Sequence, residues 1–109
     1  MNYKYGYVPK NQLNDYKKRL HSLVHWLLVY AEEAPNLLLD YIDKVQLRLN
    51  GLNELLLYPT QILEIMNLVE SAKIEFLQQE FNFKIYRKLI FDMHELIDRI
   101  NNEKVEQQC

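Results

Sequence analysis

The sequence predicts an all-α fold, an antiparallel four-helix bundle with an extended N-terminal arm. Apolar residues recur every three or four positions along four segments of the chain, which is the period of an amphipathic helix. The 109 residues include only two glycines and three prolines, too few for the many turns of a β fold. The links between the first and second segments and between the third and fourth are short, so these helices must fold back on one another.

The composition is that of one globular domain covering residues 1–109. Apolar residues make up 49% of the chain and charged residues 26%, which argues against intrinsic disorder. A chain of this length buries about two-thirds of its surface on folding, enough for a single hydrophobic core. Within this domain, residues 1–10 are expected to form the N-terminal arm and residues 102–109 a polar C-terminal tail that frays.

The first two helices are delimited by residues that favour helix ends. The first helix is expected to begin after Asn11, whose side chain can cap free amides, and to end before Pro35. Pro35 suits the first turn of the second helix, and Asn50-Gly51 is expected to end that helix before a leucine-rich link over residues 52–58. The inward stripes of these two helices are Leu13, Tyr16, Leu20, Leu23, Val24, Leu27, Ala31 and Ala34, and Leu38, Tyr41, Ile42, Val45, Leu49 and Leu52.

The last two helices are also delimited by residues that favour helix starts. Pro59 is expected to open the third helix, and the side chain of Asn82 is expected to cap the fourth. Their inward stripes are Ile62, Ile65, Met66, Val69, Ala72, Phe76 and Leu77, and Tyr86, Leu89, Ile90, Met93, Leu96, Ile97 and Ile100.

Charge and cysteine content limit the classes of function. The net charge is −2, with +4 over residues 1–19 and −6 over residues 20–109, so direct binding of nucleic acid is not expected. The single cysteine, Cys109, cannot form an intrachain disulfide, which favours a reducing compartment. The longest apolar run, residues 26–31, is far shorter than the about 20 residues that span a bilayer. We therefore expect a cytoplasmic protein with at most peripheral membrane contact.

Catalytic and metal-binding patterns are weak. His21 and His25 are four residues apart and could face one metal ion, but Ser22 stands where a zinc-protease motif needs glutamate. The third histidine, His94, is far away in the sequence, and no Glu-x-x-His pair of a di-iron bundle is present. No Gly-x-Ser-x-Gly motif occurs either. The expectation is a protein without catalytic residues, metal or cofactor, and thus not an enzyme.

The N-terminal arm is the most unusual segment. Tyr3, Tyr5 and Tyr7 alternate with Lys4 and Gly6, so in an extended conformation all three rings face one side. Such a segment could add a strand to a partner's sheet, anchor at a membrane surface or stack on bases. The alternative is an arm that lies in a groove between helices and buries its own tyrosines.

A second candidate surface consists of aromatic residues beyond those a simple stripe needs. Phe83 and Phe91 do not fall cleanly on the inward face of the fourth helix, and Tyr58 precedes the third helix. Exposed aromatic residues are typical of protein interfaces. The candidate partner-binding residues are therefore Tyr3, Tyr5, Tyr7, Tyr58, Phe83 and Phe91. Burial of the surplus aromatics in core layers, or in a homodimer interface, remains an alternative.

One stretch of the chain reads Tyr58-Pro-Thr-Gln-Ile-Leu-Glu-Ile-Met-Asn-Leu-Val and is followed by an aromatic-rich final helix over residues 82–100. This pattern resembles the immunity proteins of pediocin-like (class IIa) bacteriocins. The resemblance covers roughly the C-terminal half of the chain. It implies a cytoplasmic four-helix bundle without enzymatic activity that protects its producer. Such proteins recognise a sugar-phosphotransferase permease in the membrane that the bacteriocin has captured, and they prevent lethal pore opening.

A different class of function fits the same composition. Small acidic helical proteins encoded by phages or plasmids inhibit or regulate a soluble enzyme or nucleoprotein by presenting acidic faces to a basic site. The charge of −6 over residues 20–109 would then be the active feature. Salt-sensitive binding to a soluble partner favours this alternative, and binding to a membrane permease favours immunity.

Overall fold

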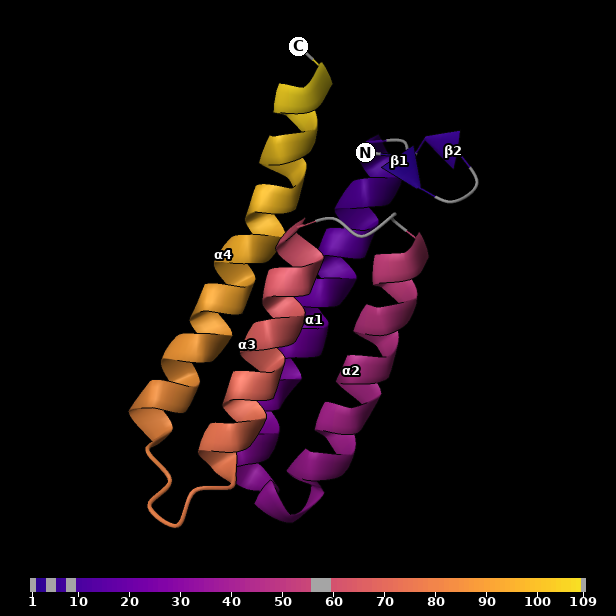
Figure 1. Ribbon diagram of the computed structural model, residues 1–109. Coiled ribbons are helices and arrows are strands. Elements are labelled where there is room, and N and C mark those ends of the chain that lie inside the picture. Colours follow the sequence, from indigo (N-terminus) through magenta and orange to yellow (C-terminus); the bar gives the residue numbers. More distant parts are fainter. Residues whose placement is uncertain (1, 4–5, 8–9, 56–59, 109) are drawn as a thin grey trace.

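The computed structural model describes the backbone of residues 2–3, 6–7, 10–55 and 60–108 and the side chains of residues 12–54 and 60–100. The described helices form an antiparallel four-helix bundle (Figure 1), which confirms the predicted fold class. Helices α1 and α3 each pack against both α2 and α4; the α3–α4 contact is the most extensive and the α1–α2 contact the least. The elements are β1 (Asn2–Tyr3), β2 (Gly6–Tyr7), α1 (Lys10–Glu33), the 3-10 turn η1 (Pro35–Leu37), α2 (Leu38–Leu55), α3 (Thr60–Phe76) and α4 (Phe83–Gln108).

The core is built from the predicted inward stripes of all four helices. Each stripe supplies a row of fully buried aliphatic side chains, because residues three or four apart lie on one helix face. Leu77 is the exception: it is 58% exposed, because α3 ends at Phe76 and Leu77 lies in the following turn. The buried apolar residues are Leu13, Leu20, Val24, Leu27, Leu38, Ile42, Val45, Leu49, Ile62, Ile65, Val69, Ala72, Tyr86, Ile90, Met93, Leu96, Ile97 and Ile100.

The predicted cap of α4 is confirmed. The Asn82 side-chain oxygen accepts hydrogen bonds from the backbone N–H groups of Lys84 (3.0 Å) and Ile85 (3.3 Å). The backbone N–H of Asn82 in turn donates to Glu75 of α3 (3.1 Å). These bonds satisfy amides that a helix start leaves without partners, and they hold the α3–α4 turn against the end of α3.

Several predicted helix ends differ from those observed. Helix α1 begins at Lys10, so Asn11 lies inside its first turn, and η1 precedes α2. Helix α2 continues through Asn50-Gly51 to Leu55, and α4 continues through most of the tail that was expected to fray, to Gln108. Pro59 and Cys109 lie outside the described residues. On both sides of Gly51 helix α2 still packs apolar side chains against the core, those of buried Leu49 and half-buried Leu52, so packing outweighs the stop signal.

The position of Gly51 leads to a stability prediction. A Cβ atom at Gly51 would meet nothing within 4 Å, and the residue lies inside α2. Gly51→Ala is therefore expected to raise the free energy of unfolding by about 0.5–1 kcal/mol, because alanine loses less backbone entropy in a helix. Urea unfolding followed by circular dichroism measures this change. A lower free energy of unfolding in the variant would contradict the helical assignment of Gly51.

Two short strands pair with each other within the N-terminal arm. Strands β1 and β2 pair in antiparallel register, Asn2 with Tyr7 and Tyr3 with Gly6, where the sequence pattern suggested one continuous extended segment. Figure 1 shows the two paired strands at the N-terminal part of the chain, before α1. None of the helices in the described part of the chain is both long and apolar enough to cross a membrane.

Candidate functional site

The predicted aromatic site residues do not form one described patch. Tyr5 and Tyr58 lie outside the described residues, so the predictions that concern them are not tested. Tyr3 and Tyr7 lie in the paired strands β1 and β2, of which only the backbone is described.

Phe83 belongs to an aromatic cluster at the end of the bundle formed by α3 and α4. It is half-buried, with its ring centroid 6.2 Å from that of Phe81 and 6.3 Å from that of Tyr86. Phe81 also contacts Phe76 edge to face at 5.4 Å. Phe83 therefore packs against the core, as the alternative interpretation of the surplus aromatics expected.

Of the two predicted site residues whose side chains are described, Phe91 is the one that lies open to solvent. Its side chain is 47% exposed, and the Arg87 guanidinium lies over its ring, 5.1 Å from the centroid. Eight residues separate it from Phe83, which places the two about 80° apart around α4 at 100° per residue. The two phenylalanines thus belong to different sides of the helix.

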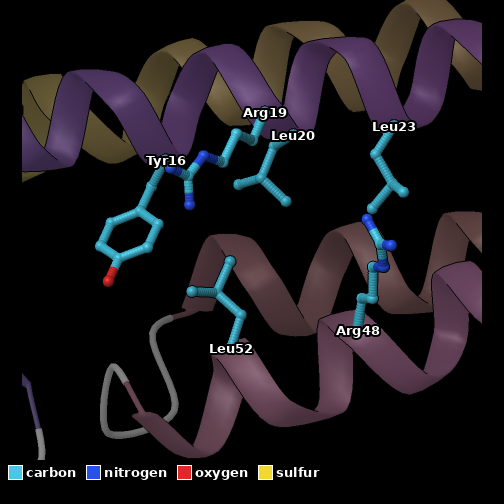
Figure 2. A pocket seen from close by; sticks show the side chains of 6 residues that line it. All are labelled: Tyr16, Arg19, Leu20, Leu23, Arg48 and Leu52. Carbon is cyan, nitrogen blue, oxygen red and sulfur yellow. The ribbon is translucent and has the colours of Figure 1, made fainter.

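A cleft between α1 and α2, the helix pair with the least extensive contact, is the better-formed candidate site. Figure 2 shows its side chains pointing into the space between the two helices. The cleft holds a volume of about 220 Å³. Its lining residues are Tyr16, Arg19, Leu20, Leu23, Arg48 and Leu52.

A second cleft of about 270 Å³ continues the first along the same two helices. Both are lined by Arg19, Leu23 and Arg48, and the second adds Ser22, Trp26 and Tyr41. We name these nine residues together the α1–α2 groove. From Tyr16 to Trp26 it follows α1 for about 15 Å, roughly three helical turns.

The α1–α2 groove has an apolar floor and cationic walls. Leu20 is buried and Leu23 and Leu52 are half-buried, whereas Arg19 and Arg48 are exposed, on opposite sides. The ion pairs found among the described side chains join His21 to Asp98, Lys73 to Asp43 and Lys88 to Asp92, so neither arginine is paired with a described carboxylate.

Aromatic side chains form the end of the groove at which Trp26 and Tyr41 lie. The Tyr41 hydroxyl donates a hydrogen bond to the Leu23 carbonyl (2.6 Å), which ties α2 to α1. Burial, with a smaller contribution from Tyr30, raises the pKa of Tyr41 to about 12, although Arg48 opposes the shift. Tyr30 lies between Tyr41 and Trp26, with ring centroids 4.7 Å and 6.1 Å away. Trp26 is 47% exposed and therefore offers a large apolar surface to a ligand.

Sequence reasoning missed the groove because its arginines are single cations within apolar stripes. Arg19 lies four residues before Leu23, and Arg48 lies four residues before Leu52. This spacing places each arginine on the edge of an inward stripe. The spacing is a usable signal, but only the pairing of α1 with α2 brings the two edges together.

The structure also joins two histidines that are distant in the sequence. His21 on α1 and His94 on α4 share a hydrogen bond between their Nδ1 atoms (2.6 Å), and His21 Nε2 lies 3.0 Å from Asp98. The ring planes are inclined by 11° with centroids 4.9 Å apart, so the rings meet at their edges. His25, the residue paired with His21 in the sequence, packs instead against Trp26.

This histidine pair leaves no space for a metal ion between its facing nitrogens. Two zinc–nitrogen bonds of about 2.0–2.1 Å need a wider separation than the observed 2.6 Å. Among the residues whose side chains are described, no group of three or more histidine, cysteine, aspartate or glutamate residues is placed to hold a metal ion.

The histidine pair leads to a prediction on pH dependence. Burial lowers the pKa of His94, and His21 and His25 lower it further, while Asp98 opposes them. As the pH falls below the ordinary histidine pKa of about 6.5, the unfolded chain therefore binds a proton at His94 that the folded chain resists. Unfolding by urea should need less denaturant at pH 5.5 than at pH 7.5.

The control for this prediction is a residue that keeps a polar contact but does not titrate. In His94→Gln the loss of stability between pH 7.5 and pH 5.5 should be smaller than in the wild type. His25→Gln, at an exposed position, removes only the smallest of the three causes that lower the pKa of His94 and should retain most of this loss of stability. An unchanged pH dependence in His94→Gln would contradict the assigned role of His94.

Two features of the described residues can thus support a function: the α1–α2 groove, and the histidine pair that joins α1 to α4. The groove offers binding groups on two helices, whereas the histidine pair is engaged in contacts within the bundle. Comparison of the chain with protein-family models, with curated proteins and with solved structures finds no match.

Proposed function

We propose that this protein is a non-enzymatic protein-binding module and that the α1–α2 groove is its docking site. The observation that carries the proposal is an apolar floor bordered by two exposed arginines and an exposed tryptophan. Arginine, tryptophan and tyrosine dominate the binding energy of protein interfaces, especially around a desolvated centre. Guanidinium, aromatic and aliphatic groups bind and orient a partner, whereas acid–base chemistry needs groups that titrate near neutral pH.

The immunity role implied by the sequence resemblance is one setting for such a module. In that setting the protein acts in the cytoplasm on a membrane permease that a bacteriocin has captured, and the groove contacts that complex. The alternative setting is inhibition or regulation of a soluble enzyme or nucleoprotein. Both settings need a stable helical scaffold with an exposed recognition surface, and they differ in the cell fraction that holds the partner.

An affinity capture from cells of the native host tests the proposal. The wild type is compared with Trp26→Ala, in the groove, and with Ile85→Ala, a matched control on α4 whose side chain is 48% exposed. The membrane and soluble fractions are analysed separately. Each variant is first shown to be folded by circular dichroism.

The expected result is one partner that the wild type and Ile85→Ala retain and that Trp26→Ala loses at least in part. A sugar permease, enriched most strongly in the presence of bacteriocin, favours immunity. A soluble enzyme or nucleoprotein favours the alternative setting. Absence of any specific partner from both fractions would contradict a protein-binding role.

A further inference from the structure

The α1–α2 groove has a charge pattern that indicates the chemistry of its occupant. Arg19 projects from α1 and Arg48 projects from α2 toward Leu23, so cations from both helices lie along the apolar floor (Figure 2). Neither guanidinium is paired with a carboxylate among the described residues. We infer that the groove binds an acidic amphipathic helix of a partner protein. This inference rests on the proposed function and specifies the partner's chemistry.

The shape of the groove fits a helix. The groove follows two antiparallel helices for about 15 Å, the length of roughly three helical turns. A third helix can lie along such a groove with apolar side chains at positions i, i+3 or i+4, and i+7 on its inner face. Leu20, Leu23 and Leu52 would receive these side chains, as the stripes of the bundle receive one another.

The cations then select the residues that flank the apolar face of the partner. Glutamate or aspartate on both flanks of the docked helix would reach Arg19 on one side and Arg48 on the other. An arginine can hold a carboxylate through two parallel hydrogen bonds, which fixes orientation as well as adding affinity. Trp26, at one end of the groove, would cover the last turn of the docked helix.

An extended anionic surface, such as a membrane or a nucleic acid, fits less well. Beyond the first 19 residues, which include Arg19 and carry +4, the chain has a net charge of −6, so a broad polyanion that extends past the groove would be repelled. The apolar floor of the groove also gives a planar array of phosphates little to contact. A narrow ligand that brings its carboxylates only to the two arginines avoids this repulsion.

Trp26 permits a direct test, because it is the only tryptophan in the chain and it lines the groove. The probes are three 18-residue helical peptides without tryptophan, each labelled with fluorescein. The first has a leucine stripe flanked by glutamates, the second replaces every glutamate by lysine, and the third is a scramble of the first without a stripe. Binding is measured by fluorescence anisotropy of each labelled peptide and by Trp26 emission with unlabelled peptide. Phosphatidylserine vesicles serve as a fourth probe.

The variants reverse charge inside and outside the groove. Arg19→Glu combined with Arg48→Glu changes the two walls, and Lys84→Glu combined with Arg99→Glu makes the same change in net charge at exposed positions on α4. The acidic peptide should bind the wild type and shift Trp26 emission to shorter wavelength. The groove variant should bind it at least about tenfold more weakly, whereas the α4 variant should stay within about threefold. Circular dichroism verifies that both variants are folded.

Three results would overturn the inference. One is that the acidic peptide binds no better than the lysine or scrambled peptide, or does not bind. Another is that reversal of both arginines leaves its affinity unchanged, and the third is that vesicles occupy the groove, with the same dependence on Arg19 and Arg48, in preference to the peptide. If the groove variant still captures the cellular partner that the wild type captures, the inference fails while the proposed protein-binding role stands.

Discussion

Replacing Tyr86 by alanine is expected to lower the free energy of unfolding by about 3–5 kcal/mol. Tyr86 on α4 is fully buried, its hydroxyl donates a hydrogen bond to the Leu27 carbonyl of α1 (2.6 Å), and its ring contacts Phe81 and Phe83. Alanine would leave a cavity where three segments of the chain meet. Because a domain of this size is stable by about 5–15 kcal/mol, urea unfolding should show a much lower midpoint.

The conservative variant Tyr86→Phe separates the ring from its hydroxyl. Phenylalanine keeps the aromatic contacts and loses only the bond to Leu27, so the expected loss of stability is about 1 kcal/mol. Burial of Tyr86 raises the pKa of its hydroxyl even further above neutral pH, so the hydroxyl keeps the proton that it donates to Leu27. Equal destabilisation by the two variants would show that ring packing contributes little, contrary to the prediction.

Replacing Ile65 by alanine is expected to lower the free energy of unfolding by about 2–5 kcal/mol. Ile65 is fully buried on the inward face of α3, and α3 packs against both α2 and α4. Truncation removes apolar contacts and leaves a cavity, because neighbouring side chains relax only in part. Urea unfolding followed at the helical circular dichroism band measures the change.

Leu63 provides the matched control on the same helix. It lies two residues from Ile65 but is 44% exposed, so Leu63→Ala should cost less than about 1 kcal/mol. A comparable loss of free energy of unfolding in Leu63→Ala and Ile65→Ala would contradict the orientation of α3 described above. The same result would follow if another molecule covered the exposed face of α3 during the measurement.

Helix identity and the inward faces could be predicted because they follow from local spacing. Leu20, Val24 and Leu27, for example, recur at helical intervals, and all three are buried. The Asn82 cap was also predictable, because a short polar side chain directly before an apolar helix satisfies amides within the same turn.

Helix ends were less predictable where packing opposed the local signal. Asn50-Gly51 is a typical stop, yet α2 continues to Leu55 because Leu49 and Leu52 pack against the core on either side of Gly51. The free energy gained when an extra helical turn buries apolar side chains can offset the small free-energy cost of glycine in a helix. The helix propensity of single residues does not include this free energy, which is gained by packing side chains against the core.

The candidate site depended on contacts between segments far apart in the chain. Phe83 looked like a surplus aromatic by helical spacing, but the α3–α4 turn brings Phe81 against it. His21 was weighed with His25, its neighbour one turn away, whereas the fold pairs it with His94. Side-chain periodicity defines which face a residue occupies on its own helix, and it does not define which partner that face meets.

The sequence by itself determined that this protein is a helical bundle with one apolar core, because amphipathic periodicity is a property of each helix alone. Only the tertiary structure decided where a partner could dock. Arg19 and Arg48 are 29 positions apart and become the two walls of one groove only when α1 and α2 lie antiparallel. The physical reason is that burying the stripes fixes the bundle, and the edges of those stripes then meet wherever helix packing places them.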